Sequence, residues 1–174
     1  MKFSYLGLCI ASLAACTDTT VEPRPPGSTV YDASVRKLQL EKRGGGLSGD
    51  PRPDVVCSSN VAKYTLTTAG HQLAWEYCQE ITTGDTTTRT PEAGARALED
   101  AEWAALEPKL ATLVVSGATD CGADKVEQAL IVTTGLGDVE YGDDFYACRD
   151  RTKPYIVGDA LDAVLGALRA LAGK

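Results

Sequence analysis

The sequence predicts an α+β domain, in which an antiparallel sheet built from β-hairpins carries two helices packed on one face and two disulfides. Two patterns support this prediction. Runs in which apolar and polar residues alternate occur in pairs around short turn sequences, as they do in β-hairpins. Two longer segments instead repeat apolar residues every three or four positions, as amphipathic helices do. The elements follow one another as hairpin, helix, hairpin and helix, an order typical of α+β folds.

The first predicted strand lies in "VRKLQLEKRGGG", where Leu38 and Leu40 alternate with polar residues before the chain reaches three glycines. Residues 63–66 and 73–77 alternate in the same way on either side of "TAGH", which predicts a β-hairpin. The next stretch, "ITTGDTTTRTPEAG", is rich in turn-forming residues. We therefore expect residues 81–94 to form a loop.

The first predicted helix lies in "EDAEWAALEPKLATLVV". Its apolar residues recur at spacings of three and four along one helical face, at Trp103, Leu106, Leu110 and Leu113. Asp100 precedes them and is expected to cap the helix. Pro108 interrupts the pattern, so we expect a kink or two short helical pieces.

The second predicted hairpin lies in "ALIVTTGLGDVEY", with residues 130–132 as an apolar arm and "TGLGD" as the turn. The last segment, "GDALDAVLGALRALAGK", has the clearest helical pattern in the chain. Asp159 is expected to cap its start and Gly173 to lie at its end. Its apolar stripe consists of Leu161, Val164, Leu165, Leu168 and Leu171.

The chain begins with Lys2 and an apolar run, residues 3–15, which is too short to cross a membrane and is typical of a signal peptide. The run ends with "LAAC", residues 13–16, which resembles the lipobox of bacterial lipoproteins. The resemblance implies cleavage before Cys16, with lipid on its sulfur and an acyl chain on the new amine. Several acyl chains anchor a protein stably, whereas one does not. An ordinary secretory signal is the alternative.

Residues 16–33 continue as a proline- and threonine-rich stretch, which predicts an extended and solvated tether. We therefore divide the chain into a lipoprotein signal peptide (1–15), the lipid-anchor cysteine with its tether (16–33) and a single α+β domain (34–174). Thr17 follows Cys16, where an aspartate would favour the inner membrane of enteric bacteria. The expected location is thus the bacterial cell envelope, at the outer membrane.

Six cysteines are present. Cys9 lies in the predicted signal peptide and Cys16 at its end, so four remain: Cys57, Cys78, Cys121 and Cys148. An even number in an exported domain predicts disulfides. A zinc site of four cysteines is the alternative, although such sites usually contain C-x-x-C pairs and none occurs here. Of the three possible pairings we favour the two that each close the open end of one hairpin, Cys57 with Cys78 and Cys121 with Cys148.

Composition argues against several activities. With 24 acidic against 17 basic residues the net charge is −7, which disfavours binding to nucleic acid. We expect contact with the membrane only through the lipid on Cys16. His71 is the only histidine and is expected to be exposed at a hairpin tip, and Asp143 and Asp144 are expected to be solvated charges. We therefore predict no catalytic residues, no metal site and no cofactor.

The segment "LQLEKRGGGLSG", residues 38–49, resembles the opening of emfourin-like proteins, which are small bacterial α+β inhibitors of thermolysin-type metalloproteases. The later order of helix, hairpin and leucine-striped helix also fits. The resemblance implies inhibition of a protease, although the four cysteines and the lipid anchor depart from that family's pattern. The candidate contact loop comprises Gly44, Gly45, Gly46, Leu47, Ser48 and Gly49.

Two functions are compatible with these observations. The first is a membrane-anchored bacterial lipoprotein whose domain binds a partner or has a structural role, without catalysis. The alternative is an envelope-tethered protease inhibitor of the emfourin-like type. The sequence does not identify the ligand or partner.

Overall fold

The computed structural model describes residues 21–45, 57, 61–119, 121–122 and 125–173. Within these residues it contains two helices, α1 (Asp100–Leu110) and α2 (Gly158–Ala172). The strands are β1 (Lys37–Gly45), β2 (Val61–Thr67), β3 (Gln72–Thr83), β4 (Thr86–Ala97), β5 (Val115–Ser116), β6 (Val126–Thr133), β7 (Asp138–Asp143) and β8 (Tyr155–Ile156).

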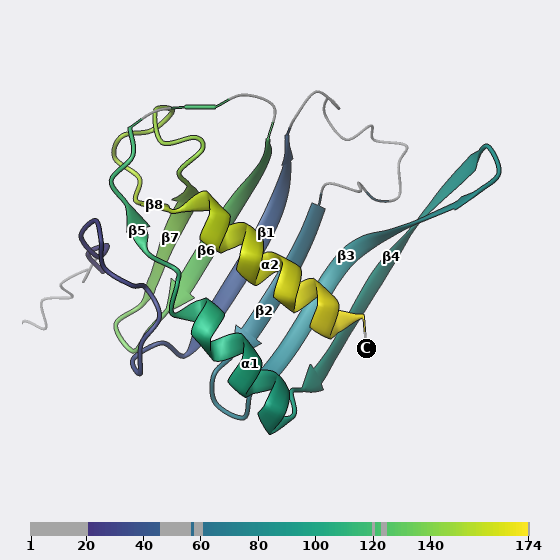
Figure 1. Cartoon of the computed structure of the whole chain (residues 1–174), viewed down its shortest axis with the longest axis horizontal. Coiled ribbons are helices and arrows are strands. Elements are labelled where there is room, and N and C mark those ends of the chain that lie inside the picture. The colour runs from purple at the N-terminus through teal and green to yellow at the C-terminus, as the bar shows by residue number, and fades with distance from the viewer. Residues whose placement is uncertain (1–20, 46–56, 58–60, 120, 123–124, 174) are drawn as a thin grey trace, which may run out of the picture.

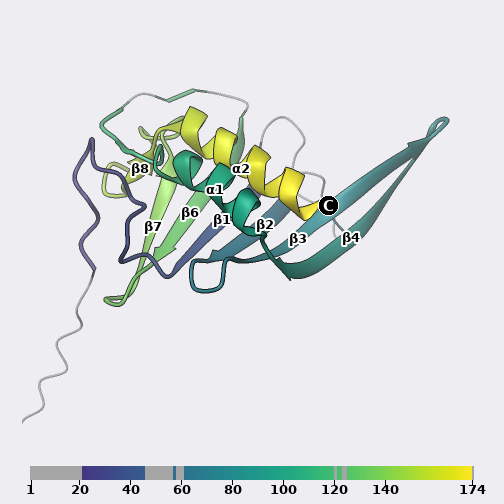
Figure 2. The same cartoon turned by 60° about the horizontal axis from the view of Figure 1, so that its bottom comes forward.

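All eight strands belong to one sheet in the order β4-β3-β2-β1-β6-β7-β8-β5, and both helices lie on the same face (Figures 1 and 2). Neighbouring strands are antiparallel except β7 and β8. The predicted class is therefore confirmed: an antiparallel sheet of hairpins with two helices on one face.

Strand β1 lies at the centre and joins the two predicted hairpins, because it pairs with β2 on one side and with β6 on the other. Leu40, for example, lies opposite Tyr64 of β2 and Leu130 of β6. All three side chains are buried beneath the helices, since alternate residues of a strand point to the same face. The core is therefore one continuous layer between sheet and helices.

Helix α2 packs the predicted leucine stripe onto the sheet, with Leu161, Val164 and Leu168 fully buried. Helix α1 lies beside α2 and buries Leu106 and Leu110. Burying a side chain of this size contributes about 1.5–3 kcal/mol to the free energy of unfolding. The pairing of α1 with α2 therefore covers the sheet from β2 and β3 to β6.

The expected caps at the starts of the helices are wrong, whereas Gly173 is the C-cap of α2 as expected. Helix α1 begins after Glu99, whose backbone N–H donates to Glu102 at 3.2 Å, and Asp100 is its first residue rather than its cap. Pro108 lies inside one continuous helix that ends two residues later, so no second piece forms. Helix α2 is preceded by Val157, and Asp159 instead lies in the first turn. A negative charge in that position interacts favourably with the helix dipole.

The expected loop at residues 81–94 is also wrong. Strands β3 and β4 are 12 residues each and pair along their whole lengths, with only Gly84 and Asp85 between them. Gly84 has a φ of 60°, which glycine adopts without steric cost. Several of the residues in this stretch are threonines, which are β-branched and favour strands.

The packed part of the chain begins before residue 34, although we expected the tether to extend through residue 33. The backbone N–H of Gly27 donates to Val115 at 2.8 Å, and that of Val30 donates to Leu113 at the same distance. Val30 is fully buried in the core. This segment therefore runs along β5, at the edge of the sheet opposite β4.

Replacing Gly94 with alanine should lower the free energy of unfolding by about 1–3 kcal/mol. Gly94 of β4 lies opposite Trp75, and a methyl group there would approach the indole carbon Cζ2 to 2.4 Å. The control is Gly166→Ala in α2, where nothing lies within 4 Å; this change should stabilise the protein by about 0.5–1 kcal/mol. Urea denaturation measures both, and an unchanged midpoint for Gly94→Ala would contradict the close packing of Trp75.

Candidate functional site

Both predicted disulfides are confirmed. Cys57 is bonded to Cys78 and Cys121 to Cys148, with Cα–Cα distances of 5.7 and 5.3 Å. Each closes the open end of one hairpin, β2–β3 or β6–β7, and both ends flank the C-terminal end of β1. By the chain-entropy model, a disulfide that closes a loop of this size adds about 3 kcal/mol to the free energy of unfolding.

The candidate contact loop is only partly within the described residues. Gly44 and Gly45 end β1, where the register with β6 shifts between Lys42 and Gly45. Residues 46–49 lie outside the described part of the chain, as does the predicted lipidation site at Cys16. The contact-loop and lipidation hypotheses therefore stay predictions.

In the described part of the chain, the outer part of the β3–β4 hairpin is a continuous run of exposed residues. We call residues 79–90 the arm. The arm projects beyond the helices and the rest of the sheet (Figures 1 and 2), and the side chains of all its residues are exposed. Ile81, half-way along it, has 50% of its surface exposed. The sequence pattern does not reveal the arm, because turn-forming residues in 81–94 predict a loop there.

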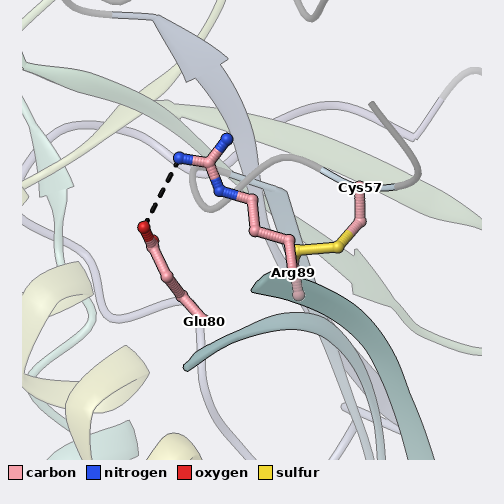
Figure 3. The surroundings of a disulfide bond; sticks show 4 residues. Cys57, Glu80 and Arg89 are labelled. Carbon is pink, nitrogen blue, oxygen red and sulfur yellow. Dashed lines mark hydrogen bonds and ion pairs between the residues drawn. A yellow bond between two sulfur atoms is a disulfide. The ribbon is translucent and has the colours of Figure 1, made fainter. Parts of the chain in front are cut away.

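The arm is braced at its base and along its length. Cys78 and Pro91 pair where the arm leaves the body, and the disulfide to Cys57 lies at that point. Glu80 and Arg89 lie opposite each other and form an ion pair at 3.5 Å (Figure 3). The hydroxyls of Thr82 and Thr87 lie 3.1 Å apart in a further cross-strand contact. An isolated two-stranded ribbon is marginally stable in water, so this bracing favours one conformation.

The surface of the arm is polar but almost neutral. Its charged side chains are Glu80, Asp85 and Arg89, and Glu80 is paired with Arg89. The rest is mainly threonine, with Ile81 as the one large apolar side chain. Such a surface has no cationic patch for nucleic acid or anionic lipid.

His71 lies in the β2–β3 turn as expected, but it is half-buried rather than exposed. Its ring is stacked on Trp103 of α1 with 4.0 Å between centroids and 6° between planes. Its backbone has a φ of 47°, and its carbonyl accepts the N–H of Leu98 at 2.9 Å. His71 therefore connects the β2–β3 turn to α1, a packing role that becomes visible only when α1 is in place.

Asp143 and Asp144 were expected to be solvated charges, and this is also wrong. The Asp143 side chain is fully buried and pairs with Lys125 at 2.7 Å, while its Oδ1 accepts the N–H of Phe145. Asp144 accepts hydrogen bonds from Ser116 and from the N–H of Gly158, the first residue of α2. The two carboxylates thus connect β7 to β5 and to the start of α2.

Lys125 also pairs with Asp162 of α2 at 3.0 Å. Burial lowers the pKa of Lys125, but its hydrogen bonds to Asp143 and Asp162 outweigh burial and raise that pKa above its usual value. The ammonium group therefore stays charged at neutral pH and compensates the buried Asp143. The charged groups of this cluster are engaged with one another and with the backbone, so we assign the cluster a structural role.

In the part of the chain that the structure describes, no group of three or more His, Cys, Asp or Glu side chains is arranged to hold a metal ion. In the same residues, neither helix is long and apolar enough to span a membrane.

The comparisons with known proteins found no similarity to report. No family model matches the sequence, no curated protein matches it, and no solved structure matches the fold.

Replacing Lys125 with methionine should lower the free energy of unfolding by about 3 kcal/mol, because the buried Asp143 loses its counter-charge. Adding Asp143→Asn should recover much of the loss. The control is Lys153→Met: its partner Glu140 keeps Arg43, so the effect should be below about 1 kcal/mol. Chemical denaturation measures all three, and equal effects of the two lysine changes would contradict the assigned role of Asp143.

Proposed function

We propose that this protein is a lipid-anchored protein of the bacterial cell envelope whose domain binds another protein through the arm and catalyses no reaction. The observation that carries the proposal is the arm itself, a braced two-stranded ribbon that is exposed on both faces. The lipid anchor is supported by the lipobox-like residues 13–16.

The arm contributes little to the stability of the domain, because its residues bury almost no apolar surface. Its rigidity instead suits binding. A segment that is already held in one conformation loses less entropy when a partner binds it. A narrow ribbon buries both of its faces only when it enters a cleft, so the partner that it fits is a folded protein with a cleft.

The chemistry of the arm agrees with a protein partner. Ile81 offers an apolar contact, the threonines offer hydroxyl donors and acceptors, and Arg89 is already paired with Glu80. Binding to a membrane or a nucleic acid would instead require unpaired cations. The expected complement is a polar, uncharged cleft with a small apolar pocket.

The position of the arm suits presentation from a membrane. The N-terminal segment enters along β5 and the arm leaves from β3 and β4, at opposite edges of an eight-stranded sheet (Figures 1 and 2). Strands lie about 4.8 Å apart, which separates these edges by about 30 Å. A lipid on Cys16 would therefore hold the arm on the side of the domain away from the point of attachment.

A protease inhibitor is the second candidate function. A rigid, exposed hairpin braced by a disulfide has a form that can occupy a protease cleft, and residues 38–49 resemble the opening of emfourin-like inhibitors. If the protein is such an inhibitor, its partner is an extracellular protease of the thermolysin type.

The lipid anchor predicts that cells grown with labelled palmitate incorporate the label into this protein. Cys16→Ser should abolish the labelling and release the protein from the membrane fraction. Cys9→Ser, within the predicted signal peptide, is the control and should leave labelling unchanged. Label that persists in Cys16→Ser would contradict the proposed anchor, and separation of inner from outer membranes would test the outer-membrane assignment.

The arm predicts that a photo-reactive amino acid at position 81 cross-links to one envelope protein, whereas the same amino acid at position 136 does not. Leu136 is the matched control because it is also apolar and 75% exposed, but lies in the β6–β7 turn. The cross-linked protein is then purified and its affinity for the variants is measured.

The decisive variant lacks residues 81–82 and 87–88, which shortens the arm while keeping the turn and the strand register. It should bind the partner at least about tenfold more weakly, whereas Leu136→Lys should bind normally. Equal binding by the shortened arm would overturn the proposal. Stoichiometric inhibition of a thermolysin-type protease that is lost in the same variant would identify the partner class as a protease, and absence of inhibition would remove the second candidate.

A further inference from the structure

A cavity of about 190 Å³ lies between one flank of α2 and the sheet, away from α1. On the sheet side, Lys42 of β1 lies opposite Ala62 of β2, and Ala62 lies opposite Tyr77 of β3. On the helix side, Leu165 and Arg169 line the cavity. These residues are far apart in the sequence and meet only because three strands and a helix converge.

Two cations in this cavity have no ion-pair partner among the described residues. Lys42 is half-buried, and burial followed by the charge of Arg169 lowers the pKa of its ammonium group. Asp162 also lines the cavity, but its carboxylate is engaged by Lys125 at 3.0 Å and by Gln128 at 2.6 Å. The charge of Asp162 acts on Lys42 in the opposite direction and offsets part of the repulsion between the two cations. An anion between Lys42 and Arg169 would remove more of that repulsion.

The Tyr64 hydroxyl in the same cavity also has no hydrogen-bond partner among the described residues. Tyr64 is 2% exposed and lines the cavity, yet its hydroxyl makes no hydrogen bond within the described part of the chain. The hydroxyl oxygen is not among the buried unpartnered polar atoms, so it is accessible from the cavity and can donate to a ligand there. Tyr77 is stacked beside Tyr64, with 6.3 Å between ring centroids.

We propose that this cavity binds a small organic carboxylate, held by Lys42, Arg169 and the Tyr64 hydroxyl. A guanidinium group matches the two oxygens of a carboxylate, and the ammonium and hydroxyl donate to the same oxygens. Val61, Ala62 and Leu165 supply apolar surface beside these donors, and Asp162, which is engaged by Lys125 and Gln128, completes one side of the cavity. An organic carboxylate fits this mixture better than phosphate, because phosphate has no apolar part to place there.

The size of the cavity limits the ligand. Sites for drug-sized molecules usually enclose about 300–1,000 Å³, and this cavity is smaller. The expected ligand is therefore a short aliphatic or single-ring carboxylate rather than a nucleotide or a peptide. The site is independent of the arm, so its failure and the failure of the proposed protein-binding function are separate results.

The experiment titrates the full-length protein, in a non-ionic detergent, with benzoate and follows its backbone amides by NMR. Benzoate should shift the amides of residues 42, 64 and 169 saturably, with a Kd of about 1 mM or below. Benzamide, the uncharged isostere, should bind at least about tenfold more weakly. Sodium chloride at equal ionic strength controls for screening.

Three variants test the assigned contacts. Lys42→Met and Arg169→Met should each weaken benzoate binding at least about tenfold, and Tyr64→Phe should weaken it about fivefold without changing the shape of the cavity. Lys63→Met is the control, because Lys63 points to the open face of the same strand and should not alter binding. Lys42→Met should also raise the denaturation midpoint of the ligand-free protein, which a purely structural role of Lys42 would not do.

Three results would overturn the proposal. Equal binding of benzamide and benzoate would show that the cavity recognises only the apolar part. Saturable shifts with inorganic phosphate but not with benzoate would assign the cavity to another anion. Absence of a saturable shift at about 10 mM benzoate, ten times the expected upper limit of the Kd, would show that no such site exists.

Discussion

The pairing of β1 with both β2 and β6 is the interaction on which the rest of the structure depends. Without it, the sheet would divide into two smaller sheets, β4-β3-β2 and β6-β7-β8-β5. With it, they form one sheet with a continuous apolar face, on which α2 buries Leu161, Val164, Leu168 and Leu171. The same pairing places the open ends of both hairpins beside the C-terminal end of β1, where each is closed by a disulfide. These links are long-range in sequence, so the core forms only when distant segments meet.

Much of this architecture could be predicted from the sequence, because local pattern and burial agree. Leu38 and Leu40 alternate with polar residues in a strand with one buried face, and the stripe from Leu161 to Leu171 repeats with the helical period. The cysteine pairing followed from the two turns. The β3–β4 hairpin could not be predicted in this way, since both faces of the arm are solvated and no alternation marks it. There the β-branched shape of threonine, rather than a buried face, is the signal that favours a strand.

The polar sites were less predictable for a related reason. Asp143 and Asp144 read as surface charges, because the sequence does not show that Lys125, Ser116 and the start of α2 surround them. The cavity beside α2 depends in the same way on cross-strand neighbours, such as Lys42 and Tyr77. A sequence reveals which side chains alternate along one strand. It does not reveal which strands become neighbours, and that determines where charges meet.

Pro91 affects whether neighbouring copies of the chain can pair along the edge strand β4. Strand β4 is the edge of the sheet, and a long exposed edge is a template on which a second copy of the chain can add its own strand. Proline has no N–H to offer, and within sheets it is tolerated where that side of the strand faces solvent. On the lipid anchor that we propose, diffusion in two dimensions brings copies together far more often than in solution. Pro91 removes one donor midway along β4, which disfavours edge-to-edge pairing with a second copy at this residue.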